Sequence, residues 1–226
     1  MHAATPPVPP RPRWQPPVLL QASVACHLGA AVAVAAAPGW WPQALGAVAL
    51  DHALLTAAGL WPRSTWLGPN LRRLPAAAAA RGEVAVTLDD GPDPEVTPRV
   101  LDILDAHGAR ASFFCIAEQA ARHPRLVREV AARGHAVQNH SLRHRHDFSL
   151  QGPRALAREI AAAQDRLADL AGRRPRFFRA PAGLRNLFLD QVLHAQGLLL
   201  ASWTRRGFDT VRRDPQQVLA LLARGL

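Results

Sequence analysis

The sequence contains no lysine, so all 27 basic residues of the 226-residue chain are arginines. Cysteine is also scarce: Cys26 and Cys115 are the only two, and neither has the C-x-x-C spacing typical of a cysteine zinc site. Cys26 lies in a hydrophobic segment and Cys115 in an expected buried strand, so we expect no disulfide between them. Cysteine therefore does not indicate a cellular compartment.

Acidic residues are nearly missing from the first 80 positions, where Asp51 accompanies five arginines. The net charge of +10 would suit a nucleic acid, an anionic lipid or an acidic glycan. The arginines are nevertheless spread along expected helices, and no nucleic-acid recognition motif accompanies them. We therefore expect no nucleic-acid partner and assign the excess charge to a membrane surface. Apolar residues make up 49%, which excludes global disorder and suffices for one sizeable domain with a small appendage.

Charged residues are absent from 18–37, a run of twenty that is long enough to cross a hydrocarbon core of roughly 30 Å. The residues PGWWP at 38–42 end this run, and a second hydrophobic stretch over 43–61 is interrupted by Asp51 and His52. The two stretches predict a transmembrane hairpin, and hence the lipid bilayer as a partner. Two alternatives are a cleaved signal peptide, because AVAVAAAP resembles a cleavage site, and a soluble helical hairpin.

Tryptophan and arginine patterns support the hairpin. Tryptophans lie before the first stretch, in the turn and after the second, which are the three interfacial positions of a hairpin: Trp14, Trp40, Trp41, Trp61 and Trp66. The turn carries no charge, whereas arginines flank both outer ends: Arg11, Arg13, Arg63, Arg72 and Arg73. The positive-inside rule then places both ends, and the domain that follows, on the cytoplasmic side of a bacterial inner membrane.

Asp51 and His52 lie near the middle of the second stretch. Ionisable residues inside a membrane are functional candidates, so a membrane interaction protein that uses them is one hypothesis. The interpretation we favour is that they pair with each other, with Gln21 or with His27 across the hairpin.

From Glu83 onward, short β-rich runs alternate with helical ones. The expected strands are 83–89, 110–116, 135–139, 176–180 and 198–204. The expected helices are 97–107, 118–133, 153–171, 186–196 and one from 215, and four of them end at a glycine: Gly108, Gly134, Gly172 and Gly197. Repeated βα units predict a parallel sheet or barrel, in which chemistry collects at the carboxyl ends of the strands. The expected organisation is a disordered Pro-rich tail (1–17), a two-span anchor (18–61), a linker (62–82) and an α/β domain (83–226).

Two adjacent carboxylates, Asp89 and Asp90, follow the first expected strand and precede Gly91-Pro92. A turn there can bring both to one pocket, where one could bind a metal while the other takes a proton. Two like charges this close need a cation or a raised pKa to coexist. The alternative interpretation is an Asx turn that caps the next helix.

Two imidazoles, His140 and His144, follow the third expected strand at a spacing that can place both on one face. His135 and His146 are nearby and could support them or lie in solvent. Two histidines with one aspartate would form a metal site with open positions for water and substrate.

Arg179 leaves the fourth expected strand and precedes Pro181-Ala182-Gly183, whose turn could free backbone N–H groups for an oxyanion. The fourth segment is 203–209 (WTRRGFD), in which Trp203 could belong to the core and Asp209 could cap a helix.

In this order, the four segments resemble the motifs of the polysaccharide deacetylase family, also called the NodB-homology domain or carbohydrate esterase family 4. The resemblance runs from about Glu83 to the end. Leu88 stands where the first motif, T-F-D-D-G-P, has Phe, whereas the second, H-[ST]-x-x-H, and the third, R-x-P-x-G, are met in full. Asp209 meets the fourth, although Thr210 stands where a Trp is often found.

The resemblance implies a distorted (β/α) barrel with fewer than eight strands that hydrolyses the N-acetyl amide, or sometimes the O-acetyl ester, of a carbohydrate. It implies Asp89 as general base, Arg179 holding that base ionised, and the Ala182 N–H facing the oxyanion. Asp209 joins the catalytic set, and Pro181 and Trp203 line the substrate. The implied ligands of a divalent metal, usually zinc with cobalt or nickel as alternatives, are Asp90, His140 and His144.

The chain departs from the family in its last part. The fifth motif, L-x-x-H-D, supplies the histidine that protonates the leaving amine, but the last histidine here is His194. We therefore expect a C-terminally truncated, incomplete barrel with an exposed edge at 198–204 and reduced stability. Losing a general acid typically costs about 10²–10⁴-fold in rate, so we expect little deacetylation. The competing hypothesis is a metal- or glycan-binding pseudoenzyme, and the sequence does not indicate the oligomeric state.

Overall fold

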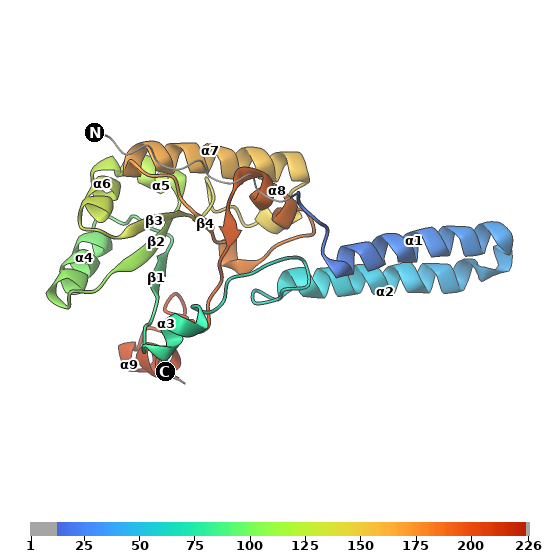
Figure 1. Cartoon of the computed structure of the whole chain (residues 1–226), viewed down its shortest axis with the longest axis horizontal. Helices are drawn as coiled ribbons and strands as arrows, with labels where there is room; N and C mark the ends of the chain where they lie inside the picture. The colour runs from blue at the N-terminus through green and yellow to red at the C-terminus, as the bar shows by residue number, and fades with distance from the viewer. Residues whose placement is uncertain (1–12, 225–226) are drawn as a thin grey trace.

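A five-stranded parallel sheet forms the centre of the α/β domain (Figure 1). The computed structural model describes residues 13–224. The strands follow one another across the sheet in chain order: β1 Val86–Asp89, β2 Ala111–Cys115, β3 Ala136–Asn139, β4 Phe177–Phe178 and β5 Leu199–Leu200. All neighbouring pairs are parallel, which confirms the predicted α/β class with a parallel sheet and brings the carboxyl ends of the strands to one edge.

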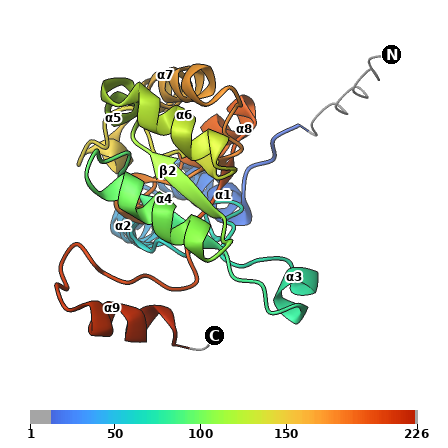
Figure 2. The same cartoon turned by 90° about the vertical axis from the view of Figure 1, so that its left-hand side faces the viewer.

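Helices pack around the sheet (Figure 2). Two apolar cores lie between the helices and the sheet, and α7 contributes to both. The helices of the domain are α4 Val96–Ala106, α5 Ala117–Arg122, α6 Pro124–Ala132, α7 Pro153–Ala171, α8 Leu189–Gln196 and α9 Pro215–Leu222. The first core lies between α4–α7 and β2 and β3, and the second between α7 and α8 and β4 and β5. Leu156, Ile160, Ala163 and Leu167 are fully buried at spacings of three and four, the pattern of an amphipathic helix.

The single helix predicted over 118–133 is wrong, because two helices, α5 and α6, occupy this range. The break falls at His123, whose φ of −125° and ψ of 56° are not helical. A residue before proline is disfavoured in the helical region, so Pro124 ends α5 and begins α6 at its first position.

The last two strands are shorter than predicted. β4 covers only Phe177–Phe178 of the expected 176–180, and β5 only Leu199–Leu200 of the expected 198–204. Beyond β4, the Arg179 guanidinium donates to Asp89 and to the Ser202 carbonyl in the pocket described below.

Two long apolar helices, α1 Val18–Ala36 and α2 Trp41–Leu60, pack side by side and project from the domain (Figure 1). A short 3-10 turn, Pro38–Trp40, connects them. Both are long and apolar enough to cross a membrane. Most of their apolar side chains are exposed, as Val32 (67%) and Leu50 (62%) illustrate, so neither helix is a core helix of the domain.

The segment after α2, which the sequence predicts to be a linker, is packed against the domain. Leu67 is 1% exposed, and a short helix, α3 Ala76–Ala80, follows. The Leu71 N–H donates to the Leu200 carbonyl over 2.9 Å, and the Leu71 carbonyl accepts from the Ser202 N–H over 2.9 Å. The edge at 198–204, which was predicted to be exposed, is therefore paired at this point.

The predicted disordered tail lies mostly outside the described residues, since the structure describes it only from residue 13. Within the described part, Trp14 donates its Nε1–H to Asp190 Oδ2 over 2.7 Å.

We expect Leu71→Pro to lower the free energy of unfolding by about 1–3 kcal/mol, because proline has no N–H to donate to Leu200 and leaves that carbonyl unpaired. Thermal unfolding of the full chain in detergent measures the effect. Leu71→Ala is the matched control, because the Leu71 side chain is 47% exposed and the alanine variant keeps the N–H. Equal melting temperatures for the two variants would show that the pairing does not stabilise the sheet.

Candidate active site

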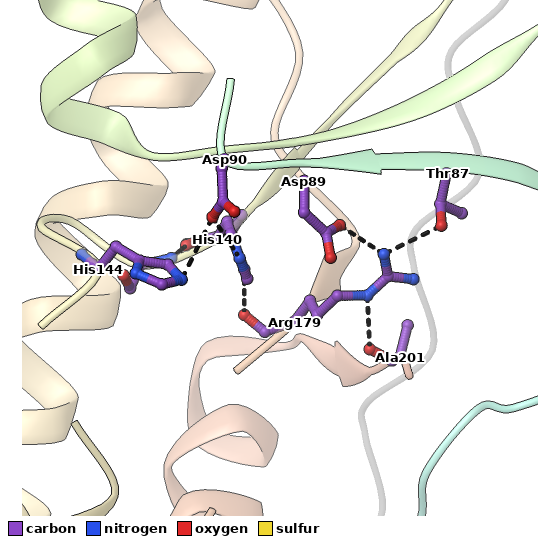
Figure 3. Close-up of polar contacts among 9 residues, drawn as sticks. Thr87, Asp89, Asp90, His140, His144, Arg179 and Ala201 are labelled. Atoms are coloured by element: carbon purple, nitrogen blue, oxygen red, sulfur yellow. Dashed lines mark hydrogen bonds and ion pairs between the residues drawn. The ribbon is translucent and has the colours of Figure 1, made fainter. Parts of the chain in front are cut away.

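Polar groups at four strand ends come together at one site, which we call the pocket (Figure 3). Asp89 ends β1 and Asp90 follows it, His140 follows β3, Arg179 follows β4 and Ser202 follows β5 closely. The pocket therefore lies at the carboxyl edge of the sheet, where a parallel α/β fold collects functional groups.

Asp90, His140 and His144 form a compact set of three ligand atoms. Asp90 Oδ1 lies 3.2 Å from His140 Nε2 and 3.2 Å from His144 Nε2. One atom from each residue lies within 4.8 Å of the other two, so all three could contact one ion. His140 is 3% exposed, whereas Asp90 is largely open to solvent.

The chemistry of this set fits a divalent cation. His140 Nδ1 lies 2.8 Å from the Arg179 carbonyl oxygen. A carbonyl can only accept, so Nδ1 carries a proton, and in the neutral ring the Nε2 lone pair points toward Asp90. A lone pair facing a carboxylate oxygen over 3.2 Å is favourable only when a cation or a proton lies between them.

The pKa values of the two flanking ligands also suit a metal. When a proton lies between Asp90 and His140, the hydrogen bond from His140 holds the pKa of the Asp90 carboxyl below its ordinary value, against the opposing effect of burial. Burial lowers the pKa of His144, and a positive charge on His140 lowers it further. Asp90 is therefore ionised and His144 uncharged near pH 7, the states that ligands must have.

The backbone around the ligands adopts a conformation that side chains with a Cβ rarely take. Asp90, Ser141, His144 and Ala182 have φ values of 68°, 70°, 53° and 53°. Such residues cost of order 1–3 kcal/mol each and persist only where neighbouring contacts hold them. Their concentration around one pocket supports a functional role for it.

A buried hydrogen-bond chain holds the loop that carries His144. The His144 N–H donates to Ser141 Oγ over 2.9 Å, and the Ser141 N–H donates to Asn139 Oδ1 over 2.9 Å. Asn139 Nδ2 in turn donates to Gln164 Oε1 of α7 over 3.0 Å. The position of His144 is thus fixed from α7. Sequence reasoning missed Asn139 and Gln164 because each looks like an ordinary polar residue.

Arg179 holds the other carboxylate. Its Nη1 donates to Asp89 Oδ1 over 2.5 Å and to Thr87 Oγ1 over 3.0 Å. Its guanidinium carbon lies 4.0 Å from the centroid of the Phe114 ring. Arg179 is 3% exposed, and burial lowers its pKa, an effect that the charge of Asp89 opposes. Thr87 lies in β1 and Phe114 in β2, and the sequence did not predict that either would contact Arg179, because residues inside strands resemble structural ones.

Trp203 and Arg206 lie beside this pair. Trp203 is half-buried, with the Arg179 guanidinium 5.7 Å and the Arg206 guanidinium 5.0 Å from its ring. After the effects of His140 and His144, the positive charge of Arg206 also lowers the pKa of Asp90. Arg206 therefore faces the pocket, although nothing in the pattern of the sequence singled it out.

The remaining predicted residues are placed differently. Pro181 is buried and Ala182 is exposed, and the Ala182 N–H makes no hydrogen bond within residues 13–224. Asp209 lies in an exposed turn and has no hydrogen bond or ion pair with the described part of the chain. The structure thus brings together all the predicted side chains of the first three segments, and Trp203 of the fourth, but leaves Asp209 away from Asp89.

We expect His140→Ala to lose one bound Zn²⁺ per chain relative to the unsubstituted protein, because it removes the ligand whose orientation is fixed by the Arg179 carbonyl. Metal content after equilibrium dialysis measures this. His146→Ala is the matched control, since His146 is an exposed histidine of the same loop outside the ligand set. An unchanged zinc content in His140→Ala would contradict the assignment.

The sequence and the fold are similar to those of known proteins. A model of the family described as polysaccharide deacetylase matches residues 76–201. A peptidoglycan-N-acetylglucosamine deacetylase of Bacillus cereus is 34% identical over 126 residues, which cover 55% of this chain and 45% of that protein. A chitooligosaccharide deacetylase of Sinorhizobium fredii is 34% identical over 152 residues, which cover 62% of this chain and 69% of that protein.

Solved structures agree with these matches. A family 4 carbohydrate esterase from Streptomyces lividans, in complex with acetate, superposes with a TM-score of 0.59 at 32% identity and covers 62% of this chain and 72% of that one. A peptidoglycan N-acetylglucosamine deacetylase superposes with a TM-score of 0.63 at 29% identity and covers 67% and 69%. The motif residues, the parallel sheet and the matched range lead to one conclusion: this chain belongs to the polysaccharide deacetylase family.

Proposed function

We propose that the chain is a metal-dependent hydrolase that removes N-acetyl, or O-acetyl, groups from a carbohydrate. The observation that carries the proposal is the pairing of a candidate base, Asp89, with the three-residue cation pocket directly beside it. The named relatives that act on acetylated glycans support the same substrate class.

In the proposed mechanism Asp89 accepts the proton of the attacking water, because Arg179 holds one of its oxygens and leaves the other free. Asp90, His140 and His144 would hold the divalent ion, with Zn²⁺ favoured by two imidazoles and one carboxylate, and Co²⁺ or Ni²⁺ as alternatives. A bound divalent ion would supply polarisation of the substrate carbonyl and acidification of water.

Three further residues would complete the pocket. The Ala182 N–H is free of partners among the described residues and would donate to the developing oxyanion. Trp203 offers an aromatic face, and Pro181 supports the loop, so both would line the sugar. Asp209 lies in an exposed turn, so it would act in the catalytic set only after that turn moves toward the pocket.

We also propose that α1 and α2 form a membrane anchor. Their exposed apolar side chains and the tryptophans near their ends support a bilayer as their surroundings, and the arginines outside both ends favour a cytoplasmic domain. The segment after α2 lies against the loops at the pocket. A Cβ on Gly183 would lie 2.8 Å from Pro62, and Arg63 donates to the Thr204 carbonyl. This proximity favours a lipid-linked sugar over a distant polymer.

A second candidate function is binding of a metal or glycan without turnover. The observation that favours it is the exposed position of Asp209, which makes no hydrogen bond or ion pair within residues 13–224 and so has no contact that would hold it in the pocket. Amine departure needs a proton from a donor, whereas a phenolate leaves without one. An aryl acetate and an acetylated sugar amide therefore separate the two functions.

We expect the zinc-loaded chain to release acetate from 4-nitrophenyl acetate, and to release it from N,N′,N″-triacetylchitotriose much more slowly. Asp89→Asn should lower the aryl acetate rate about 10²–10⁴-fold, because the amide cannot accept the proton, although it can still accept from Arg179. Chromatographic quantification of acetate measures both reactions, with His146→Ala as the control. Equal rates for Asp89→Asn and the unsubstituted chain would refute the hydrolase and leave the binding function.

A further inference from the structure

A second cluster of metal-ligating side chains lies in the hairpin, far from the pocket. His27 stands near the middle of α1, and Asp51 and His52 near the middle of α2. One ligand atom from each lies within 4.8 Å of the other two, and the His27 and His52 rings are 5.2 Å apart. The pairing with Gln21 that the sequence allowed is not formed, because Gln21 donates to the Pro16 carbonyl.

The hydrogen bonds of this cluster leave a carboxylate without a compensating charge. Ser23 donates its hydroxyl to Asp51 Oδ2 over 2.7 Å, which satisfies one lone pair but supplies no positive charge. His27 Nδ1 lies 3.8 Å from Asp51 Oδ2, too far for a hydrogen bond, and 2.8 Å from the Ser23 carbonyl oxygen. Nδ1 therefore carries a proton and donates it to that carbonyl, which leaves Nε2 as the ring nitrogen that can bind an ion.

A cation at this point would compensate the charge of an ionised Asp51. Asp51 is 8% exposed even before any surroundings are added to the hairpin, and neither α1 nor α2 contains an arginine. A buried carboxylate among apolar helices is costly unless a positive charge pairs with it. When the carboxyl is ionised and both imidazoles are neutral, the three side chains sum to −1, and a divalent ion brings the sum to +1.

The arrangement of side chains in the hairpin cluster is the same as that in the domain pocket. At both places a histidine Nδ1 lies 2.8 Å from a backbone carbonyl, with a carboxylate and a second histidine beside it. A carbonyl that fixes the tautomer of a histidine is the usual support of a metal ligand. Cys26 neighbours His27 but does not belong to the set.

We propose that His27, Asp51 and His52 form a second divalent-cation site, which takes Zn²⁺ or a similar borderline transition-metal ion. Imidazole and carboxylate donors select this class of ion over Ca²⁺ or Mg²⁺, which prefer oxygen ligands alone. The ion joins α1 to α2 halfway along their length and neutralises Asp51 there. This site is independent of the proposed hydrolase activity.

The test counts bound zinc in the full chain, purified in detergent, stripped with a chelator and dialysed against limiting Zn²⁺. We expect two zinc ions per unsubstituted chain and one in His140→Ala/His144→Ala, which lacks the domain pocket. Adding His27→Ala/His52→Ala should remove the remaining ion. Cys26→Ala in the same background is the matched control and should retain it. Circular dichroism verifies that each variant is helical.

Asp51→Asn in the otherwise unsubstituted chain gives a second test, because the amide keeps the shape of the side chain and can still accept from Ser23. We expect this variant to bind one zinc ion per chain instead of two. Replacing Zn²⁺ by Co²⁺ in the His140→Ala/His144→Ala background should give d–d bands without a thiolate charge-transfer band. No ion in that background, an ion that survives substitution of both hairpin histidines, or one lost with Cys26→Ala would each overturn the proposal.

Discussion

The buried guanidinium of Arg179 is the interaction on which the arrangement of the pocket depends. Its side chain bonds to Thr87 and Asp89 of β1 and to the carbonyls of Ala201 and Ser202 after β5. Its own N–H donates to the Asn139 carbonyl of β3. One residue thus connects three strands that are not all neighbours in the sheet, and it does so at the edge where the chemistry is concentrated.

The same residue couples the two halves of the site. Its side chain holds the candidate base, Asp89, while its carbonyl fixes the ring of His140, which faces the cation pocket. A guanidinium this deeply buried needs a carboxylate and carbonyl oxygens around it, because desolvation alone disfavours its charge. The buried guanidinium and the carbonyl of Arg179 therefore position both the candidate base and a candidate metal ligand.

Much of this could be predicted from the sequence, because it depends on local signals. The parallel α/β class followed from alternating runs, α7 was one of the predicted helical runs, and the ends of helices followed from glycines such as Gly172, whose φ of 67° is left-handed. The candidate ligand set was predicted from polar residues placed directly after strands. What could not be predicted depends on contacts between distant segments: the pairing of Leu71 with β5 and the support of the His144 loop by Gln164.

Gly183 shows how closely the hairpin and the pocket are joined. Its φ is 75°, and an added Cβ would lie 2.6 Å from the Trp203 ring and 2.8 Å from Pro62, so the loop after Arg179 touches the residue that follows Trp61 at the end of α2. The Arg185 N–H also donates to the Gly59 carbonyl in the last turn of α2. Because α2 and the loop after Arg179 are in close contact, a tilt of α2 would displace the loop that carries Ala182. The thickness of a surrounding bilayer influences the tilt of a spanning helix, so it would also change the geometry of the pocket.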